Sequence, residues 1–272
     1  YCTPRPVVDL RLGRGCPYGL CAFCAIQQHH IGYRATSIER LVQGITRAQD
    51  RLQTRFFRIR DDLVTPHQLK ALGAAIGAMS RDVRWSARAR FQKGLSKNIL
   101  QEAHAGGLEE LWLGLESASP EVRSRMVKGV NQATVKRVVA DGAEIGIRLR
   151  ALCIVGFPGE TAAQLETTVA FLTSNLDRLT AASISRFELM RKSPMAADPA
   201  AFGIHVRSDR TPRSARLRYT LPATWESPLS DPAARASLKR LHDKLMPRIE
   251  VEQCPDAAHG WLRASITKRP IA

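Results

Sequence analysis

Short apolar segments alternate with helix-forming segments over most of the first 190 residues of this chain. Between the apolar segments, hydrophobic residues recur at helical spacing, as at Ile38, Leu41 and Ile45. A strand–helix–strand alternation predicts right-handed crossovers and therefore a parallel sheet covered by helices. The strands expected from this pattern are residues 7–12, 56–59, 83–86, 111–115, 149–155 and 182–189.

Six strand–helix units predict an α/β fold, a partial (β/α)6 barrel of the TIM type, over residues 1–190. Helix-capping residues agree with the pattern, because Ser37, Thr65 and Ser119 each precede an expected helix. After about residue 191 the periodicity weakens, with one further helix near 233–245. We expect residues 191–272 to form a C-terminal extension that packs on the barrel. Barrels of this type carry their chemistry on loops at the C-terminal strand ends.

The net charge of +16 favours an anionic partner, and nucleic acid is one candidate. The arginines are scattered along the chain, which does not by itself indicate an RNA-binding surface. No run of about 18 apolar residues is present, so we expect no membrane span and a soluble, cytoplasmic protein. The chain begins with Tyr1 and shows no readable signal peptide, and a piece cut from a longer protein stays open as one interpretation.

Three of the six cysteines, Cys16, Cys21 and Cys24, lie within nine residues, directly after the first expected strand. Such clustering favours a metal centre over a set of disulfides. Thiolates select iron–sulfur clusters, zinc or copper(I), and a [4Fe-4S] cluster held by three cysteines leaves one iron open to an outside ligand. The alternative is a structural zinc site with Cys2 or His29 as the fourth ligand.

The sequence Gly-Cys-Pro-Tyr from Gly15, followed by Cys-x-Phe-Cys ending at Cys24, resembles the cluster loop of radical S-adenosylmethionine (SAM) enzymes. The resemblance implies a [4Fe-4S] cluster whose open iron binds SAM, and an electron donor such as flavodoxin or ferredoxin. It also implies that Phe23 lies near the adenine. The family spacing is C-x3-C-x2-C, whereas this chain has C-x4-C-x2-C, and Gly19 is expected to accommodate the extra residue.

Carboxylates follow two of the expected strands. Asp61 and Asp62 follow the second strand, at the position where the family often binds the SAM amino group, and the residues alone do not separate the two.

The segment from Gly114 through Glu116 and Ser117 resembles that of cobalamin-associated and methylthiotransferase-like members. In these members, polar groups of this segment lie beside a helix N-terminus and bind ribose hydroxyls or a carboxylate. The alternative is that Ser117 and Ser119 only cap the helix. Lys128 is expected to be a helix C-terminal charge.

The segment around Ile154 and Gly156 resembles the fifth-strand motif of the family, in which the backbone flanks the adenine. Members of the family often carry an acidic residue at the position of Leu152. Because this chain has leucine there, the resemblance gives less support for a ribose contact at this position. Arg150 shares a strand face with Ile154 and is a candidate partner for the SAM carboxylate, with a solvated arginine as the alternative. His29, His30 and the Cys254–His259 pair are weaker candidates for ligands or proton donors.

The resemblance therefore implies an enzyme that cleaves SAM reductively and abstracts hydrogen with a 5′-deoxyadenosyl radical. The first hypothesis is modification of a peptide or small natural product, such as methylation with cobalamin bound by a domain outside this chain. The second is modification of RNA, which the positive charge favours. The third is a zinc-stabilised binding protein. Catalytic acids and bases are not identified by the sequence.

Overall fold

The computed structural model describes residues 6–26, 32–207, 219–245 and 250–252. Cys2, His29, His30, Cys254 and His259 lie outside these ranges. Seven strands form one parallel sheet in the order β1-β4-β5-β6-β7-β8-β11. Six of them confirm the expected strands: β1 (Val8–Leu10), β4 (Phe56–Ile59), β5 (Arg84–Arg90), β6 (Leu108–Glu116), β7 (Arg148–Val155) and β8 (Ala181–Arg186). The seventh, β11 (Glu250–Glu252), pairs with β8 and was not expected.

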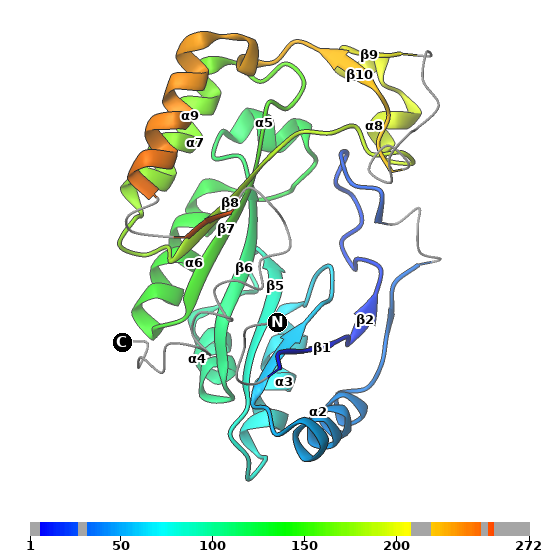
Figure 1. Cartoon of the computed structure of the whole chain (residues 1–272), viewed down its shortest axis with the longest axis vertical. Helices are drawn as coiled ribbons and strands as arrows, with labels where there is room; N and C mark the ends of the chain where they lie inside the picture. Colours follow the sequence, from blue (N-terminus) through cyan, green and yellow to red (C-terminus); the bar gives the residue numbers. More distant parts are fainter. Residues whose placement is uncertain (1–5, 27–31, 208–218, 246–249, 253–272) are drawn as a thin grey trace.

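Helices follow the strands of the sheet as the alternation predicts, and Figure 1 shows α4, α6, α7 and α9 stacked along one side of the sheet. Ser37, Thr65 and Ser119 are the N-caps of α2, α3 and α5, and each side chain accepts a hydrogen bond from a backbone N–H in the first turn. The helices are α2 (Ile38–Leu52), α3 (Pro66–Gly77), α4 (Lys97–Ala105), α5 (Pro120–Arg125), α6 (Gln132–Ile145), α7 (Ala162–Ser174), α8 (Pro194–Ala197) and α9 (Pro232–Leu245). The chain has the α/β fold of a partial TIM-type barrel, as expected.

The main hydrophobic core lies between the helices and one face of the sheet, which we call the outer face. Phe57, Trp85, Leu111 and Leu149 lie on this face and have no exposed surface. Because side chains alternate along a strand, the residues between them point to the opposite, inner face. The inner face is where a partial barrel presents its polar groups.

Shorter elements frame the two ends of the barrel. A two-stranded ladder of β2 (Gly13–Arg14) and β3 (Arg34–Ala35) flanks the cysteine loop, and a second ladder joins β9 (Ile204–Val206) to β10 (Ala223–Trp225). Two 3-10 helices, η1 (Ala200–Phe202) and η3 (Pro228–Ser230), complete the described elements. No helix in the described ranges is both long and apolar enough to span a bilayer.

Candidate functional site

The cysteine loop follows β2 and runs from Gly15 to Cys24. Gly19 has a φ of 64°, in the left-handed region, and the next residue, Leu20, is 60% exposed. Glycine adopts this backbone conformation without steric cost. The extra residue of the C-x4-C spacing is therefore accommodated by an outward bulge at Gly19, as the sequence predicted.

Backbone contacts tie the cysteine loop to the segment that follows α5. The Tyr18 hydroxyl donates to the Val127 carbonyl at 2.7 Å, and the Ala22 N–H donates to the Met126 carbonyl at 3.0 Å. The guanidinium of Arg90 stacks on the Tyr18 ring, with its Cζ 3.5 Å from the ring centroid. The two hydrogen bonds join residues more than a hundred positions apart, and with the Arg90 contact they hold the loop beside the turn after α5 and the end of β5.

The Ala22 carbonyl also accepts a hydrogen bond from the N–H of Met195 in α8, at 3.0 Å. In Figure 1 the blue N-terminal segment and the yellow segment around α8 accordingly lie side by side. The cysteine loop is therefore held from two sides, by the turn after α5 and by the start of the C-terminal part.

The three thiols of the loop are partly buried, and the charges of Cys16 and Cys21 act on the pKa of Cys24, as that of Cys16 acts on the pKa of Cys21. Burial raises the pKa of Cys21 and raises that of Cys24 to about 11. Deprotonating such thiols needs a nearby positive charge, which a bound metal supplies. The donor set thus fits a thiolate-bound cluster.

A mononuclear zinc site makes different demands. Zinc requires four donors packed around one ion. Among the described residues, no three Cys, His, Asp or Glu side chains are arranged to hold a single metal ion. A zinc site would therefore need Cys2 or His29, which lie outside the described ranges.

A buried ion pair stands beside the thiols. Lys128 Nζ lies 2.6 Å from Glu116 Oε1, and the two side chains are 9% and 11% exposed. Both groups act on the pKa of Cys21, and Lys128 also lies 6.0 Å from the ring centroid of Phe23. The expectation that Lys128 is only a helix C-terminal charge is wrong, because α5 ends at Arg125 and Lys128 is turned inward to meet Glu116. Its charge is what allows the Glu116 carboxylate to be buried.

The backbone of Glu116 is strained to make this pair. Glu116 has a φ of 60°, which is uncommon for a residue with a side chain, and the β6–β7 register shifts between Gly114 and Glu116. A Cβ at Gly114 would lie 2.7 Å from Lys128 Nζ, so glycine is needed there to leave room for the pair. Strain of this kind persists where surrounding contacts enforce it, often at functional sites.

The structure separates Asp61 from Asp62. Asp61 is 1% exposed, and its Oδ1 accepts the Leu12 N–H at 2.8 Å, so this carboxylate holds the chain that leads into the cysteine loop. Burial raises the pKa of Asp61 to about 6. Asp62 is partly exposed on the same loop. Of the two, Asp62 is therefore the one with a carboxylate accessible to a ligand.

Ser117 and Ser119 belong to the start of α5. The Ser117 hydroxyl lies 3.2 Å from that of Thr168 and accepts the Ser119 N–H at 3.1 Å, and Ser117 has no exposed surface. Ser119 caps the helix through the Val122 N–H. The alternative interpretation as capping residues is confirmed for Ser119, and Ser117 supports the same turn.

Phe23 and Ile154 lie against one small hydrophobic cluster that includes Phe157 and Met126. The sequence placed these residues near one ligand, and the structure brings them together. Gly156, with a φ of 75°, has another reason to be glycine: a Cβ would lie 2.7 Å from Leu229 in η3. The Trp225 Nε1 also donates to the Gly156 carbonyl at 2.8 Å. The C-terminal part thus covers one side of this loop.

Arg150 lies in the first half of β7, away from the cysteine loop. It is 1% exposed, its Nε lies 3.2 Å from Glu110 Oε1, and its Cζ lies 4.8 Å from the Trp112 ring centroid. The alternative of a solvated arginine is wrong, because a paired and buried guanidinium is not solvated. Its contacts lie in the middle of the inner face.

A partial parallel barrel with three thiols on the loop after its first strands is the arrangement of an enzyme whose chemistry depends on a thiolate-bound cofactor. The sequence profile of the radical SAM superfamily matches residues 10–172, which is more than half of the chain. The chain belongs to the radical SAM superfamily.

Curated relatives include proteins named as methyltransferases and methylthiotransferases, and one named as a cyclase. The chain is 26% identical over 161 residues to an uncharacterised methyltransferase of Pyrococcus horikoshii, covering 58% of this chain and 35% of the relative. It is 31% identical over 186 residues to the ribosomal protein uS12 methylthiotransferase RimO of Thermosynechococcus vestitus, covering 62% and 40%. The chain thus spans less than half the length of either relative.

Solved structures with the same fold include cobalamin-dependent enzymes. The radical SAM methyltransferase TsrM of Kitasatospora setae, with cobalamin and a [4Fe-4S] cluster bound, superposes with a TM-score of 0.72 at 17% identity. The match covers 91% of this chain and 54% of TsrM. The cobalamin-dependent radical SAM enzyme OxsB superposes with a TM-score of 0.67 at 14% identity, covering 84% of this chain and 40% of OxsB. At these identities the likeness concerns the fold.

Proposed function

We propose that this chain is the catalytic core of an enzyme that holds a [4Fe-4S] cluster on Cys16, Cys21 and Cys24 and cleaves SAM reductively. The observation that carries the proposal is the cysteine loop, with three thiols held beside the buried Glu116–Lys128 pair. Three cysteines leave one iron of such a cluster open to an outside ligand. The bound cluster would supply one electron to SAM, from an external donor such as flavodoxin or ferredoxin.

The surrounding residues would bind and orient SAM. Asp62 would offer its accessible carboxylate to the amino group, and Glu116 would contact a ribose hydroxyl. Phe23 and Ile154 give the adenine an apolar surface, with the backbone at Gly156 beside it. Asp61 and Ser117 would act by positioning these groups, because Asp61 Oδ1 and the Ser117 hydroxyl hydrogen-bond to the protein. Residues 191–272 would form a C-terminal extension that packs on the barrel.

We further propose that the substrate is a peptide or small natural product and that the transferred group is a methyl group. The relatives with methyltransferase names and the cobalamin-bound structural neighbours support this, with cobalamin supplied by a domain outside the chain. RimO, by its name, modifies a ribosomal protein. RNA is the second candidate substrate, and the net charge of +16 favours it.

The test is anaerobic reduction of cluster-reconstituted protein with SAM, with and without cobalamin, followed by mass spectrometry. We expect 5′-deoxyadenosine or S-adenosylhomocysteine from the wild type and neither from Cys21→Ala. The matched control is Cys153→Ala, because this thiol is 2% exposed and packs in the main core on the outer face of the sheet. Equal turnover in wild type and Cys21→Ala would overturn the ligand assignment.

Metal analysis of the same preparations tests the zinc alternative. Iron and sulfide in the wild type, retained in Cys153→Ala and lost in Cys21→Ala, would support the cluster. Stoichiometric zinc in anaerobically purified protein, without iron or sulfide, would contradict it.

A further inference from the structure

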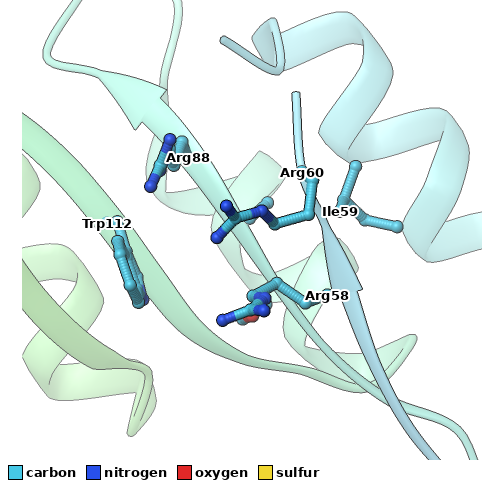
Figure 2. A pocket seen from close by; sticks show the side chains of 7 residues that line it. Arg58, Ile59, Arg60, Arg88 and Trp112 are labelled. Carbon is cyan, nitrogen blue, oxygen red and sulfur yellow. The ribbon is translucent and has the colours of Figure 1, made fainter. Parts of the chain in front are cut away.

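The inner face of the sheet carries a cluster of basic side chains that the proposed SAM site does not use. Arg58 in β4 is the register partner of Ser86 in β5, and Arg88 is the partner of Trp112 in β6. With Arg60, these residues line a small recess of about 10 Å³. Figure 2 shows the side chains of Arg58, Arg60 and Arg88 extending into one space beside the Trp112 ring. We call this the arginine pocket.

Positive charge in the arginine pocket exceeds the negative charge that the described residues provide. Asp9, which is 46% exposed, is shared by two arginines: Arg58 Nε lies 2.7 Å and Arg60 Nε 3.7 Å from its carboxylate oxygens. Arg88 forms no ion pair within the described ranges. Burial lowers the pKa of Arg88 and the charge of Arg60 lowers it further; Asp62 opposes this, and Arg58 and Arg11 add smaller lowering effects. A bound anion would relieve this repulsion.

Two hydrogen-bond donors in the wall of the pocket have no partner. Ser86 is 1% exposed and Trp112 is 3% exposed, and neither Ser86 Oγ nor Trp112 Nε1 is hydrogen-bonded in the part of the chain that the structure describes. Leaving a buried donor unpaired costs about 1–3 kcal/mol, so such groups call for an explanation. A ligand with acceptor oxygens would supply the missing partners.

We propose that the arginine pocket binds a carboxylate group of the substrate. The proposal rests on the proposed function, and it narrows the substrate to an acidic peptide or a small carboxylic acid. A carboxylate matches guanidinium groups in size and geometry and can accept two hydrogen bonds side by side. RNA is less suited, because its phosphates extend along a strand and are met by surface tracks rather than by one recess in a sheet.

The experiment is isothermal titration of reconstituted protein, saturated with SAM under anaerobic conditions, with phenylacetate as the probe. Saturation with SAM prevents the probe from binding in place of the SAM carboxylate. Phenylacetamide has the same shape without the charge and is the control ligand. We expect phenylacetate to bind at least about tenfold more tightly than phenylacetamide, which is the usual effect of one charge-assisted hydrogen bond.

Arg88→Gln is the variant that tests the pocket, and we expect it to weaken phenylacetate binding at least about tenfold. Arg60→Gln is a second variant, in case Arg88→Gln does not fold. Arg51→Gln is the matched control, because it removes the same charge from the exposed last turn of α2 and should leave binding unchanged.

Several outcomes would overturn the carboxylate assignment. The first is equal affinity for phenylacetate and phenylacetamide, and the second is unchanged phenylacetate affinity in both pocket variants. The third is tighter binding of inorganic phosphate than of phenylacetate. The fourth is binding of single-stranded RNA that is lost in Arg88→Gln but kept in Arg51→Gln. Assaying SAM cleavage on the same wild-type sample separates this inference from the proposed function. Cleavage without phenylacetate binding overturns only the inference, and phenylacetate binding without cleavage overturns the proposed function.

Discussion

The two faces of the sheet are built from the same strands but bury different chemistry. On the outer face Phe57, Trp85 and Leu111 pack against helices with no exposed surface. On the inner face the neighbouring positions carry arginines, such as Arg58 and Arg88. Apolar packing on one side holds the strands in place, and the other side is then free to carry groups that would be costly to bury without partners. The fold thus depends on the outer face, and the proposed ligand sites lie on the inner face and its rim.

The largest effect on stability is expected at the rim, where charge is buried. Lys128→Met leaves the Glu116 carboxylate without its partner and should lower the free energy of unfolding by about 3–5 kcal/mol. Urea denaturation of the unreconstituted protein measures this change. The double variant Glu116→Gln with Lys128→Met should recover at least half of the loss, because it removes both charges. A loss under about 1 kcal/mol in the single variant would show that the pair is not buried as described.

On the outer face, Leu111→Ala should cost about 2–5 kcal/mol, because it removes a fully buried side chain and leaves a cavity. The same denaturation experiment measures it. Unlike the loss in Lys128→Met, this loss should be insensitive to salt, since no charge is involved. If Leu111→Ala lowered the free energy of unfolding no more than a substitution at an exposed position does, the outer face would not be the main core.

The loop after β7 offers a test that depends on pH. Glu160 is 4% exposed, its carboxylate accepts the Gly156 N–H at 2.7 Å, and burial raises its pKa from 4.5 to about 7. The folded protein therefore favours the protonated form. This contribution to stability is fully present below about pH 4.5 and is lost as pH rises through about 7.

Between pH 5 and pH 8 the loss amounts to about 2 kcal/mol for Glu160 alone. We expect Glu160→Gln to remove this part of the pH dependence, so that the variant gains on the wild type as pH rises. Thermal unfolding of both proteins across this range measures the difference. Parallel pH profiles would show that the Glu160 carboxyl titrates normally.

The smallest effect is expected from the inner face. Arg60→Gln breaks only the 3.7 Å contact with an exposed Asp9, and such pairs contribute about 0–1 kcal/mol. Its free energy of unfolding should stay within about 1 kcal/mol of that of the wild type, or rise slightly as repulsion with Arg88 is relieved. Urea denaturation beside Leu111→Ala gives the comparison directly. A cost equal to that of Leu111→Ala would remove the distinction between the two faces.

The sequence predicted the outer face better than the inner one. The six strands were found because their apolar residues form continuous or alternating runs, and the cysteine loop because its spacing is local. The short strand β11 carries no such run. The arginines looked scattered along the chain, yet Arg58 and Arg60, and likewise Arg88 and Arg90, stand two residues apart and so share a strand face. That alternation was a readable signal.

Lys128 could not be assigned in this way. Its partner Glu116 is twelve residues away, and the two meet only because the strained end of β6 and the turn after α5 fold toward each other. The same holds for the glycines. The sequence offered a ligand as the reason for Gly156, and the structure adds a second reason, because a Cβ there would meet Leu229, more than seventy residues away. Long-range packing of this kind leaves no local pattern.

The most direct test of the central claim is electron paramagnetic resonance of the reduced, reconstituted protein before and after addition of SAM. Three cysteine ligands leave one iron able to bind SAM, so the signal of the reduced cluster should change when SAM is added. The change should be absent in Cys21→Ala and present in Cys153→Ala. A cluster signal in the wild type that does not respond to saturating SAM would contradict the account.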